Sequence, residues 1–285
     1  MLLTKVQFTI ILVIIIFYLK LRLLMIYTKI PMLSISSYSL VDKPLNIFRT
    51  SKKRIVNYEA YTECYHKWLI LNPNVKMYWY TDRDVDKYMK TQSMRIYNAY
   101  RIIKPGAYKI DLFRLCILYQ YGGLYIDDQA TPYVPIKEML KHTNSDFVSV
   151  LDSKNALEGI HNGFIYCKNK GHPFLKKAIE DVVTNIINKS YEDHALAITG
   201  PIALRRSINR CLNRDSETRF QAGLNNFGSP EKNVFLFQFV FGPNQNIYKK
   251  NRKILSKKYN FLIWVFDSLN RSKYTNMYRM KTVFD

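Results

Sequence analysis

The stretch from Ala107 to Pro132, AYKIDLFRLCILYQYGGLYIDDQATP, constrains the fold more than any other part of the chain. Apolar residues surround its predicted helix, Ile110–Leu118, on nearly all sides, so this helix is expected to be buried rather than amphipathic. Gly122 and Gly123 can supply the left-handed backbone that ends a helix. The apolar segment Leu124–Ile126 is then just long enough for a buried strand. A buried helix leading into a buried strand indicates an α/β fold.

The rest of the chain alternates between strand-like and helix-like patterns. Alternation with a period of two predicts half-buried strands, and a proline in the first turn favours a helix. The predicted strands are Leu45–Arg49, Val75–Tyr80, Asp146–Leu151 and Gly163–Cys167, and the predicted helices are Tyr58–Leu71, Pro173–Asn188, Pro201–Leu212 and one capped by Thr81 and Asp82. This order predicts an α/β sandwich.

Two charged residues, Asp111 and Arg114, interrupt the buried helix. Their i,i+3 spacing places a carboxylate and a guanidinium on one helix face. Burying both is costly unless they pair with each other or meet a ligand. Two interpretations stay open, a satisfied structural ion pair and a pair of ligand-binding groups.

The predicted strand Leu124–Ile126 ends on two carboxylates, Asp127 and Asp128. Ligands of open α/β sheets bind beyond the carboxyl ends of the strands. Carboxylate oxygens suit Mg²⁺ or Mn²⁺, and such an ion would neutralise charge developing on a departing nucleoside diphosphate. The alternative is a surface turn that is rich in aspartate and binds nothing.

The whole stretch resembles the DXD region of glycosyltransferase family 32, whose members share the GT-A fold. That family includes yeast-type initiating α-mannosyltransferases, α-galactosyltransferases and capsular polysaccharide enzymes. Its members carry a helix of pattern A-x-x-S/K-D-x-x-R followed by GG-x-Y-x-D-x-D. The matching positions are Ala107, Lys109, Asp111, Arg114, Gly122, Gly123, Tyr125 and Asp127. The resemblance implies a GT-A-type nucleotide-sugar-binding sandwich with a mixed central sheet.

The resemblance also implies roles for single residues. Asp111 and Arg114 would contact the donor sugar or its phosphates, while Tyr125 and Asp127 would hold donor and metal. The neighbouring Asp128 is counted with them as a donor-binding residue. The expected catalytic residues are therefore Asp127, Asp111 and Arg114. The expected substrate is a nucleotide-sugar, and the expected cofactor is Mn²⁺ or Mg²⁺.

Weaker matches extend the resemblance on both sides. The segment LNIFRTS resembles the opening family strand that meets the nucleotide, so Thr50 is expected to bind the donor, although Ser51 stands where a tryptophan is usual. The segments that resemble family parts lining the acceptor side are Asn162-Gly163, His172-Pro173 and Thr199-Gly200-Pro201. An isolated loop histidine is usually solvated, so neither His161 nor His172 is counted as a site residue.

The sequence departs from the family pattern at the second DXD carboxylate, where Gln129 stands, while Asp128 is an additional carboxylate. A glutamine can bind a hard cation only through its neutral carbonyl. The predicted metal ligands are therefore Asp127, Asp128 and Gln129. Weakened metal affinity and loss of activity are the alternatives to a small shift in register that would let Asp128 substitute.

The N-terminal segment is apolar, and Val6–Leu19 reads VQFTIILVIIIFYL without a charge. No small-x-small cleavage site follows it, so an uncleaved single-pass membrane anchor is predicted over residues 1–30, with a cleaved signal peptide as the alternative. A stem at 31–44, a catalytic domain at 45–247 and a basic, aromatic extension at 248–285 would follow. The catalytic domain could face the cytosol or a Golgi/ER-like lumen.

Composition limits the remaining function classes. The formal net charge of +21 predicts a surface that attracts anions. The chain has no zinc-finger spacing or RNA-binding aromatic signature, so nucleic acid is not an expected partner. The leading hypothesis is a retaining glycosyltransferase that uses a UDP- or GDP-sugar and a glycan, lipid or protein acceptor. The alternative is a catalytically degraded, membrane-anchored protein that binds an acidic glycan or another anion.

Overall fold

The computed structural model describes residues 44–51, 59–128, 130–152, 159–240, 245–257 and 274–285. The predicted membrane anchor at 1–30 and Gln129 lie outside the described residues. Within the described ranges, no helix combines the length and the apolar character that crossing a bilayer requires.

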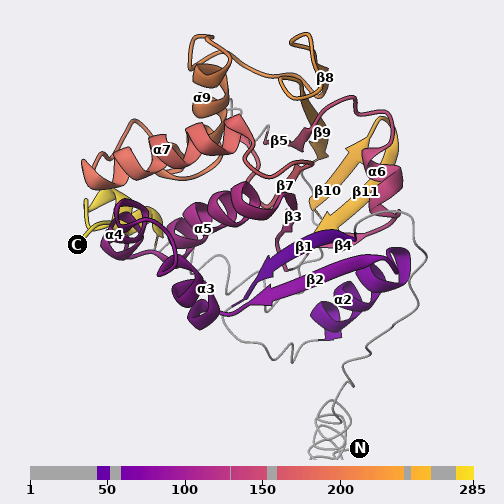
Figure 1. Ribbon diagram of the computed structural model, residues 1–285, viewed down its shortest axis with the longest axis horizontal. Helices are drawn as coiled ribbons and strands as arrows, with labels where there is room; N and C mark the ends of the chain where they lie inside the picture. The colour runs from indigo at the N-terminus through magenta and orange to yellow at the C-terminus, as the bar shows by residue number, and fades with distance from the viewer. Residues whose placement is uncertain (1–43, 52–58, 129, 153–158, 241–244, 258–273) are drawn as a thin grey trace, which may run out of the picture. The chain divides into compact units, whose positions relative to one another are not determined.

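Strands and helices alternate along the described chain, as the sequence pattern predicts (Figure 1). The strands are β1 (Leu45–Thr50), β2 (Val75–Tyr80), β3 (Gly123–Ile126), β4 (Ala130–Pro132), β5 (Phe147–Asp152), β6 (Gly159–Ile160), β7 (Phe164–Cys167), β8 (Gly223–Asn225), β9 (Val234–Val240), β10 (Gln245–Lys249) and β11 (Arg252–Lys257). The helices are α2 (Glu59–Leu71), α3 (Asp82–Met89), α4 (Met94–Ile102), α5 (Gly106–Tyr121), α6 (Ile136–Leu140), α7 (Pro173–Ile187), α8 (Ala195–Ile198) and α9 (Pro201–Cys211).

The strands form one mixed sheet in the order β2-β1-β3-β7-β5-β9-β10-β11-β4, with β6 and β8 pairing outside this path. Strand β1 runs parallel to both β2 and β3, whereas β7 runs antiparallel to β3. The carboxyl ends of β1, β2 and β3 therefore meet the amino end of β7 at one edge of the sheet. The predicted α/β fold with a mixed central sheet is confirmed.

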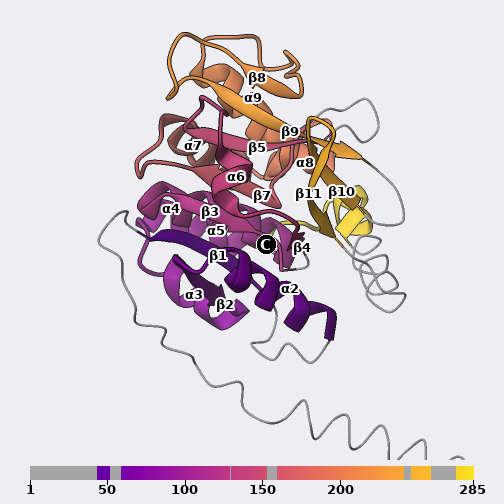
Figure 2. The same ribbon diagram turned by 90° about the vertical axis from the view of Figure 1, so that its right-hand side faces the viewer.

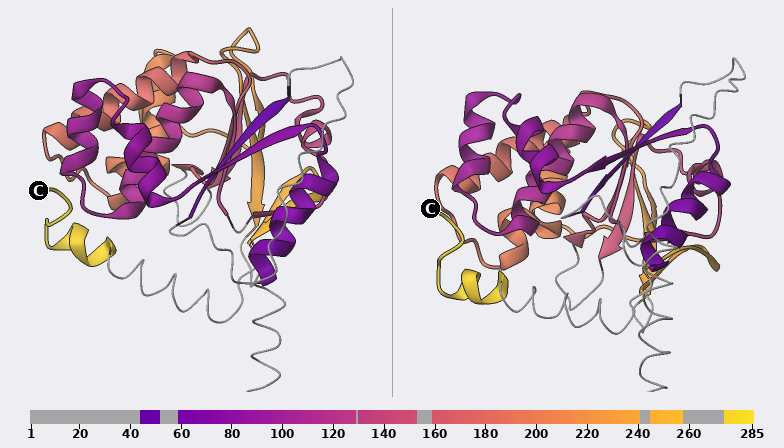
Figure 3. Two further views of the ribbon diagram at one scale, coloured as in Figure 1. Left: turned by 60° about the horizontal axis from the view of Figure 1, so that its bottom comes forward. Right: turned by 90° about the horizontal axis from the view of Figure 1, so that it is seen from below.

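Helices cover both faces of the sheet (Figures 1 and 2). The larger hydrophobic cluster joins α3, α4, α5, α7 and α9 to one face, to which β1 contributes Phe48 and β3 contributes Tyr125. The smaller cluster joins α2 and α6 to the other face, to which the same strands contribute Ile47 and Leu124. Figure 3 shows the strands between the helical layer and the indigo helix α2. Consecutive residues of a strand thus serve opposite layers, because their side chains alternate.

The junction between α5 and β3 is formed by two glycines. Gly122 ends α5 with a φ of 64°, and its N–H donates to the carbonyl of Leu118 at 2.8 Å. Gly123 has a φ of 100°, and a Cβ at this position would lie 2.5 Å from the carbonyl oxygen of Asn46 on β1. The predicted left-handed end of the helix is confirmed, and it lets the chain turn directly into a buried strand.

The C-terminal residues take part in the same packing. Strand β11 pairs with β10 and β4, and the predicted domain boundary at residue 247 falls within β10. Farther on, Val283 and Phe284 are buried in the larger cluster, and the carbonyl of Val283 accepts from the N–H of Lys104 at 2.9 Å. The described residues after Lys43 belong to one compact unit.

We expect Gly123→Ala to destabilise the protein more than Gly171→Ala does. Both glycines have positive φ, but a Cβ on Gly171 meets nothing within 4 Å. Gly171→Ala should therefore cost only the left-handed penalty of about 1–2 kcal/mol. Gly123→Ala adds the overlap with Asn46 and should cost about 3 kcal/mol or more in total. Urea denaturation measures both, and equal losses would show that the β1 backbone yields to the new methyl group.

Candidate functional site

A network of polar side chains lies where β3 ends, and the guanidinium of Arg114 is its centre. The side chain is 9% exposed and lies 3.5 Å from Oδ1 of Asp111 and 3.9 Å from Oδ1 of Asp127. Its guanidinium carbon lies 4.5 Å from the centroid of the Tyr125 ring. Helix α5 is apolar around nearly its whole circumference, so the face that carries Arg114 is buried against the end of β3. The buried cation therefore meets two carboxylates and one aromatic ring.

Asp111 is held from three directions. Its Oδ2 accepts from the hydroxyl of Thr199 at 2.8 Å, and its Oδ1 accepts from the amide of Asn162 at 3.2 Å. Burial raises the pKa of the Asp111 carboxyl more than Arg114, Asn162 and Thr199 lower it. Burial likewise opposes the charge of Arg114, but Tyr125, Asp111 and Asp127 outweigh it and raise the pKa of this guanidinium. The ion pair of Asp111 and Arg114 is thus not isolated, because Asn162 and Thr199, from two other segments of the chain, donate hydrogen bonds to Asp111.

Tyr125 connects this network to β1. Its hydroxyl lies 2.8 Å from Oγ1 of Thr50, the last residue of β1. Burial raises the pKa of the Tyr125 hydroxyl to about 12, so it stays protonated at neutral pH. The residues that the sequence predicted to bind the donor and that the structure brings together are Thr50, Asp111, Arg114, Tyr125 and Asp127.

Asp127 is the most open carboxylate of the network, with 28% of its side chain exposed. Its backbone N–H donates to the carbonyl of Gly163 at 3.0 Å, which ties the end of β3 to the start of β7. Asp128 follows half-buried, near enough to Tyr125 to raise the pKa of its hydroxyl. Carboxylate oxygens suit a hard divalent cation. In the described part of the chain, however, no three side chains of the types His, Cys, Asp or Glu are grouped to hold a metal.

Arg49 is a residue of this region that the sequence reasoning missed. It is fully buried on the α2 side of β1, and its Nη2 donates to the carbonyl of Asp128. The guanidinium lies 5.0 Å from the ring of Trp79, and its Nε and Nη1 have no hydrogen-bond partner. A cation within the buried strand LNIFRT was the signal that could have identified it. Arg49 thus holds the turn after β3 from the face opposite to Arg114.

The two loop histidines have different environments. His172 is 3% exposed, so the expectation that it is solvated is wrong. It caps α7 by accepting from the N–H of Phe174 at 3.2 Å, and burial lowers its pKa to about 4. His161 is half-buried, and its ring and the Asp127 carboxylate both approach the Cα of Gly163, where the absence of a side chain leaves room for them. The sequence offered no signal for this proximity, which arises when β7 pairs with β3.

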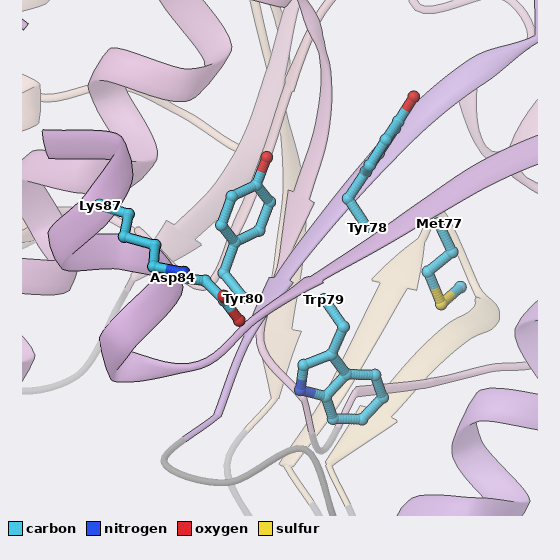
Figure 4. Close-up of a pocket in the computed structure, with 6 residues that line it drawn as sticks. All are labelled: Met77, Tyr78, Trp79, Tyr80, Asp84 and Lys87. Atoms are coloured by element: carbon cyan, nitrogen blue, oxygen red, sulfur yellow. The ribbon is translucent and has the colours of Figure 1, made fainter. Parts of the chain in front are cut away.

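A groove of about 430 Å³ runs along β2 at the edge of the sheet (Figure 4). It is lined by Met77, Tyr78, Trp79, Tyr80, Asp84 and Lys87. Trp79 and Tyr80 point to opposite sides of the strand in Figure 4, so the groove follows the strand edge and does not include the network around Arg114. The indole N–H of Trp79 donates to Oγ of Ser51 at 2.6 Å. The family pattern has a tryptophan at the position of Ser51. In this protein Trp79, from the neighbouring strand β2, lies next to that position.

Comparison with known proteins gives a family match over the central part of the chain. Residues 59–146 match the model of the glycosyltransferase sugar-binding region containing the DXD motif. This range includes Trp79, Asp111, Arg114, Tyr125 and Asp127. Thr50, Asn162 and Thr199, which complete the network, lie outside it.

One curated relative is the initiation-specific alpha-1,6-mannosyltransferase of Candida albicans, which is 30% identical over 118 residues. The matched part covers 39% of this chain and 30% of that protein, so the chain spans less than a third of the relative.

Two solved structures show limited similarity. The PaToxG glycosyltransferase is 16% identical, with a TM-score of 0.46 over 59% of this chain and 69% of that one. The apo-form glycosyltransferase GlyE of Streptococcus pneumoniae TIGR4 is 11% identical, with a TM-score of 0.32 over 85% of this chain and 64% of that one. The fold assignment therefore depends on the sheet topology. Over residues 59–146, the chain is thus similar to the sugar-binding region of the glycosyltransferases that contain the DXD motif.

Proposed function

We propose that this protein transfers a sugar from a UDP- or GDP-sugar to a glycan, lipid or protein acceptor, with retention of anomeric configuration and with a divalent metal. The observation that carries the proposal is the network around Arg114, which brings together five residues that the family resemblance predicted to bind the donor, beside the carboxyl ends of the parallel strands β1 and β3. This edge is where α/β sheets bind nucleotides. The site would belong to a GT-A-type sandwich, and residues 1–30 would anchor it to a membrane.

The reaction breaks the bond between the anomeric carbon and a diphosphate oxygen, which keeps the electron pair, and forms a bond from that carbon to the oxygen of an acceptor hydroxyl, whose proton passes to the leaving diphosphate. The leaving diphosphate takes up negative charge, so preorganised positive groups accelerate the step. Arg114 is preorganised, because Asp111, Asp127 and the ring of Tyr125 hold its guanidinium in place. Thr50 and Tyr125 add hydroxyl groups at the same edge.

Asp127 and Asp128 would hold Mn²⁺ or Mg²⁺, which would supply further positive charge to the diphosphate. Their carboxylates are at least partly exposed, and both belong to the turn that directly follows β3. Arg114 offsets one carboxylate charge of the network, and the remaining negative charge favours a bound cation.

The second candidate function is a degraded family member that binds an anion without catalysis. It is motivated by Gln129, which stands where the family pattern has a carboxylate, and by the net charge of +21. Nucleoside-diphosphate release separates the two functions, because a protein that only binds does not consume the donor.

We expect the full chain to release nucleoside diphosphate from one member of a panel of UDP- and GDP-sugars in Mn²⁺ and not in EDTA. Asp127→Asn should lower this release at least about a hundredfold, because it removes a charged ligand at the reacting diphosphate. Asp86→Asn is the matched control, since Asp86 pairs with the exposed Lys90 at the end of α3. Full release by Asp127→Asn, or no release from any donor by the folded wild type, would contradict the proposal.

Arg49→Met should lower donor turnover about tenfold or more while leaving the free energy of unfolding nearly unchanged. The substitution frees the carbonyl of Asp128 and so misplaces the turn after β3. It also removes a buried cation with two unbonded nitrogens, and an apolar replacement of such a group is often neutral. Arg205→Met, whose guanidinium pairs with Glu217 on another part of the fold, is the control. Unchanged turnover in Arg49→Met would show that Arg49 does not position the turn.

A further inference from the structure

The side chains of His161 and Asp127 both approach the position that a Cβ of Gly163 would occupy. A Cβ on Gly163 would overlap both Oδ2 of Asp127 and Cε1 of His161. The φ of Gly163 lies outside the left-handed region, so space rather than backbone conformation demands glycine here. The imidazole is thus packed close to the most open carboxylate of the network.

The orientation of His161 is set by its surroundings. Its backbone N–H donates to the carbonyl of Val150 at 2.9 Å, and its ring stacks on Phe239 with centroids 5.8 Å apart. The ring Nδ1 accepts from the N–H of Gly163 at 2.9 Å. A nitrogen that accepts a hydrogen bond carries no proton, so the neutral ring carries its proton on Nε2. Nε2 is bonded to Cε1, the ring atom that faces the space shared with Asp127.

Two other histidines show what a purely structural role of this contact looks like. His172 and His194 each accept through Nδ1 from the N–H two residues later, and each thereby caps the first turn of a helix. His161 makes the same local contact, but strand β7 follows it. The contact of His161 therefore does not cap a helix. Its consequence is to fix the tautomer of the His161 ring next to Asp127.

We propose that His161 binds the donor diphosphate by donating a hydrogen bond from Nε2 to a phosphate oxygen, beside the group that Asp127 holds. This inference rests on the proposed function, because it assigns a further ligand contact to the same site. A neutral N–H donor suits an anionic oxygen such as that of a phosphate. His161 thereby adds a contact from the β5–β7 side of the sheet, opposite to the one from Thr50 on β1.

Two substitutions separate this role from a structural one. In His161→Asn, the side-chain oxygen can still accept from the N–H of residue 163, because asparagine forms this turn readily, but the distal N–H is lost. In His161→Gln, the longer amide can still present an N–H near the position of Nε2. His194→Asn is the matched control, since it changes the same type of local contact on α8.

The measurement is calorimetric titration of the full chain with UDP and with GDP, in Mn²⁺ and in EDTA, together with titration by Mn²⁺ alone. We expect His161→Asn to bind the preferred nucleotide about tenfold more weakly, the size expected for one hydrogen bond to a charged group. His161→Gln should retain most of the affinity, and His194→Asn should match the wild type.

The possible failures are distinguishable. Wild-type affinity in His161→Asn would assign His161 to the turn alone and overturn this inference while leaving the proposed function intact. Loss of Mn²⁺ binding by both His161 variants without nucleotide would make His161 a metal ligand and would also overturn it. If the folded wild type binds neither UDP nor GDP, the proposed function fails, and this inference fails with it.

Discussion

The positive charge of Arg114 must be compensated inside the protein, because its side chain is buried where α5 meets the end of β3. An unpaired buried guanidinium costs several kcal/mol, so the fold has to bring carboxylates to it. Asp111 comes from the preceding turn of the same helix, and Asp127 comes from the strand end that the Gly122-Gly123 turn delivers. The ion pairs of Arg114 therefore stabilise the arrangement of α5, the glycine turn and β3. That arrangement in turn brings the three charged side chains together.

The end of β3 is held from both faces of the sheet. Arg114 lies on the face covered by α5, whereas Arg49 lies on the face covered by α2 and donates to the carbonyl of Asp128. The alternation of side chains along β1 and β3 explains this division, because neighbouring residues point to opposite layers. Two buried cations thus flank one turn and offset part of the negative charge that Asp111, Asp127 and Asp128 bring to it.

Much of this arrangement could be predicted from the residues alone. The buried character of α5, its end at Gly122 and the strand bounds of β2 follow from local patterns that tertiary contacts reinforce. The i,i+3 spacing of Asp111 and Arg114 correctly indicated a shared face. The position of Arg49 beneath the turn and the burial of His172 could not be read in the same way. Both depend on which elements pack together, and no local pattern encodes that.

The sequence by itself determined the chemistry at the centre of the site, since a cation and carboxylates spaced along one helix, turn and strand meet through local geometry. Only the tertiary structure decided what surrounds them. Asn162 and Thr199 reach Asp111 because β7 pairs with β3 and α8 and α9 pack nearby, at sequence separations of 51 and 88 residues. His161 approaches Asp127 through the same strand pairing, at a glycine whose missing side chain leaves the necessary space. Contacts over such separations arise from sheet topology, which a single chain's periodicity does not specify.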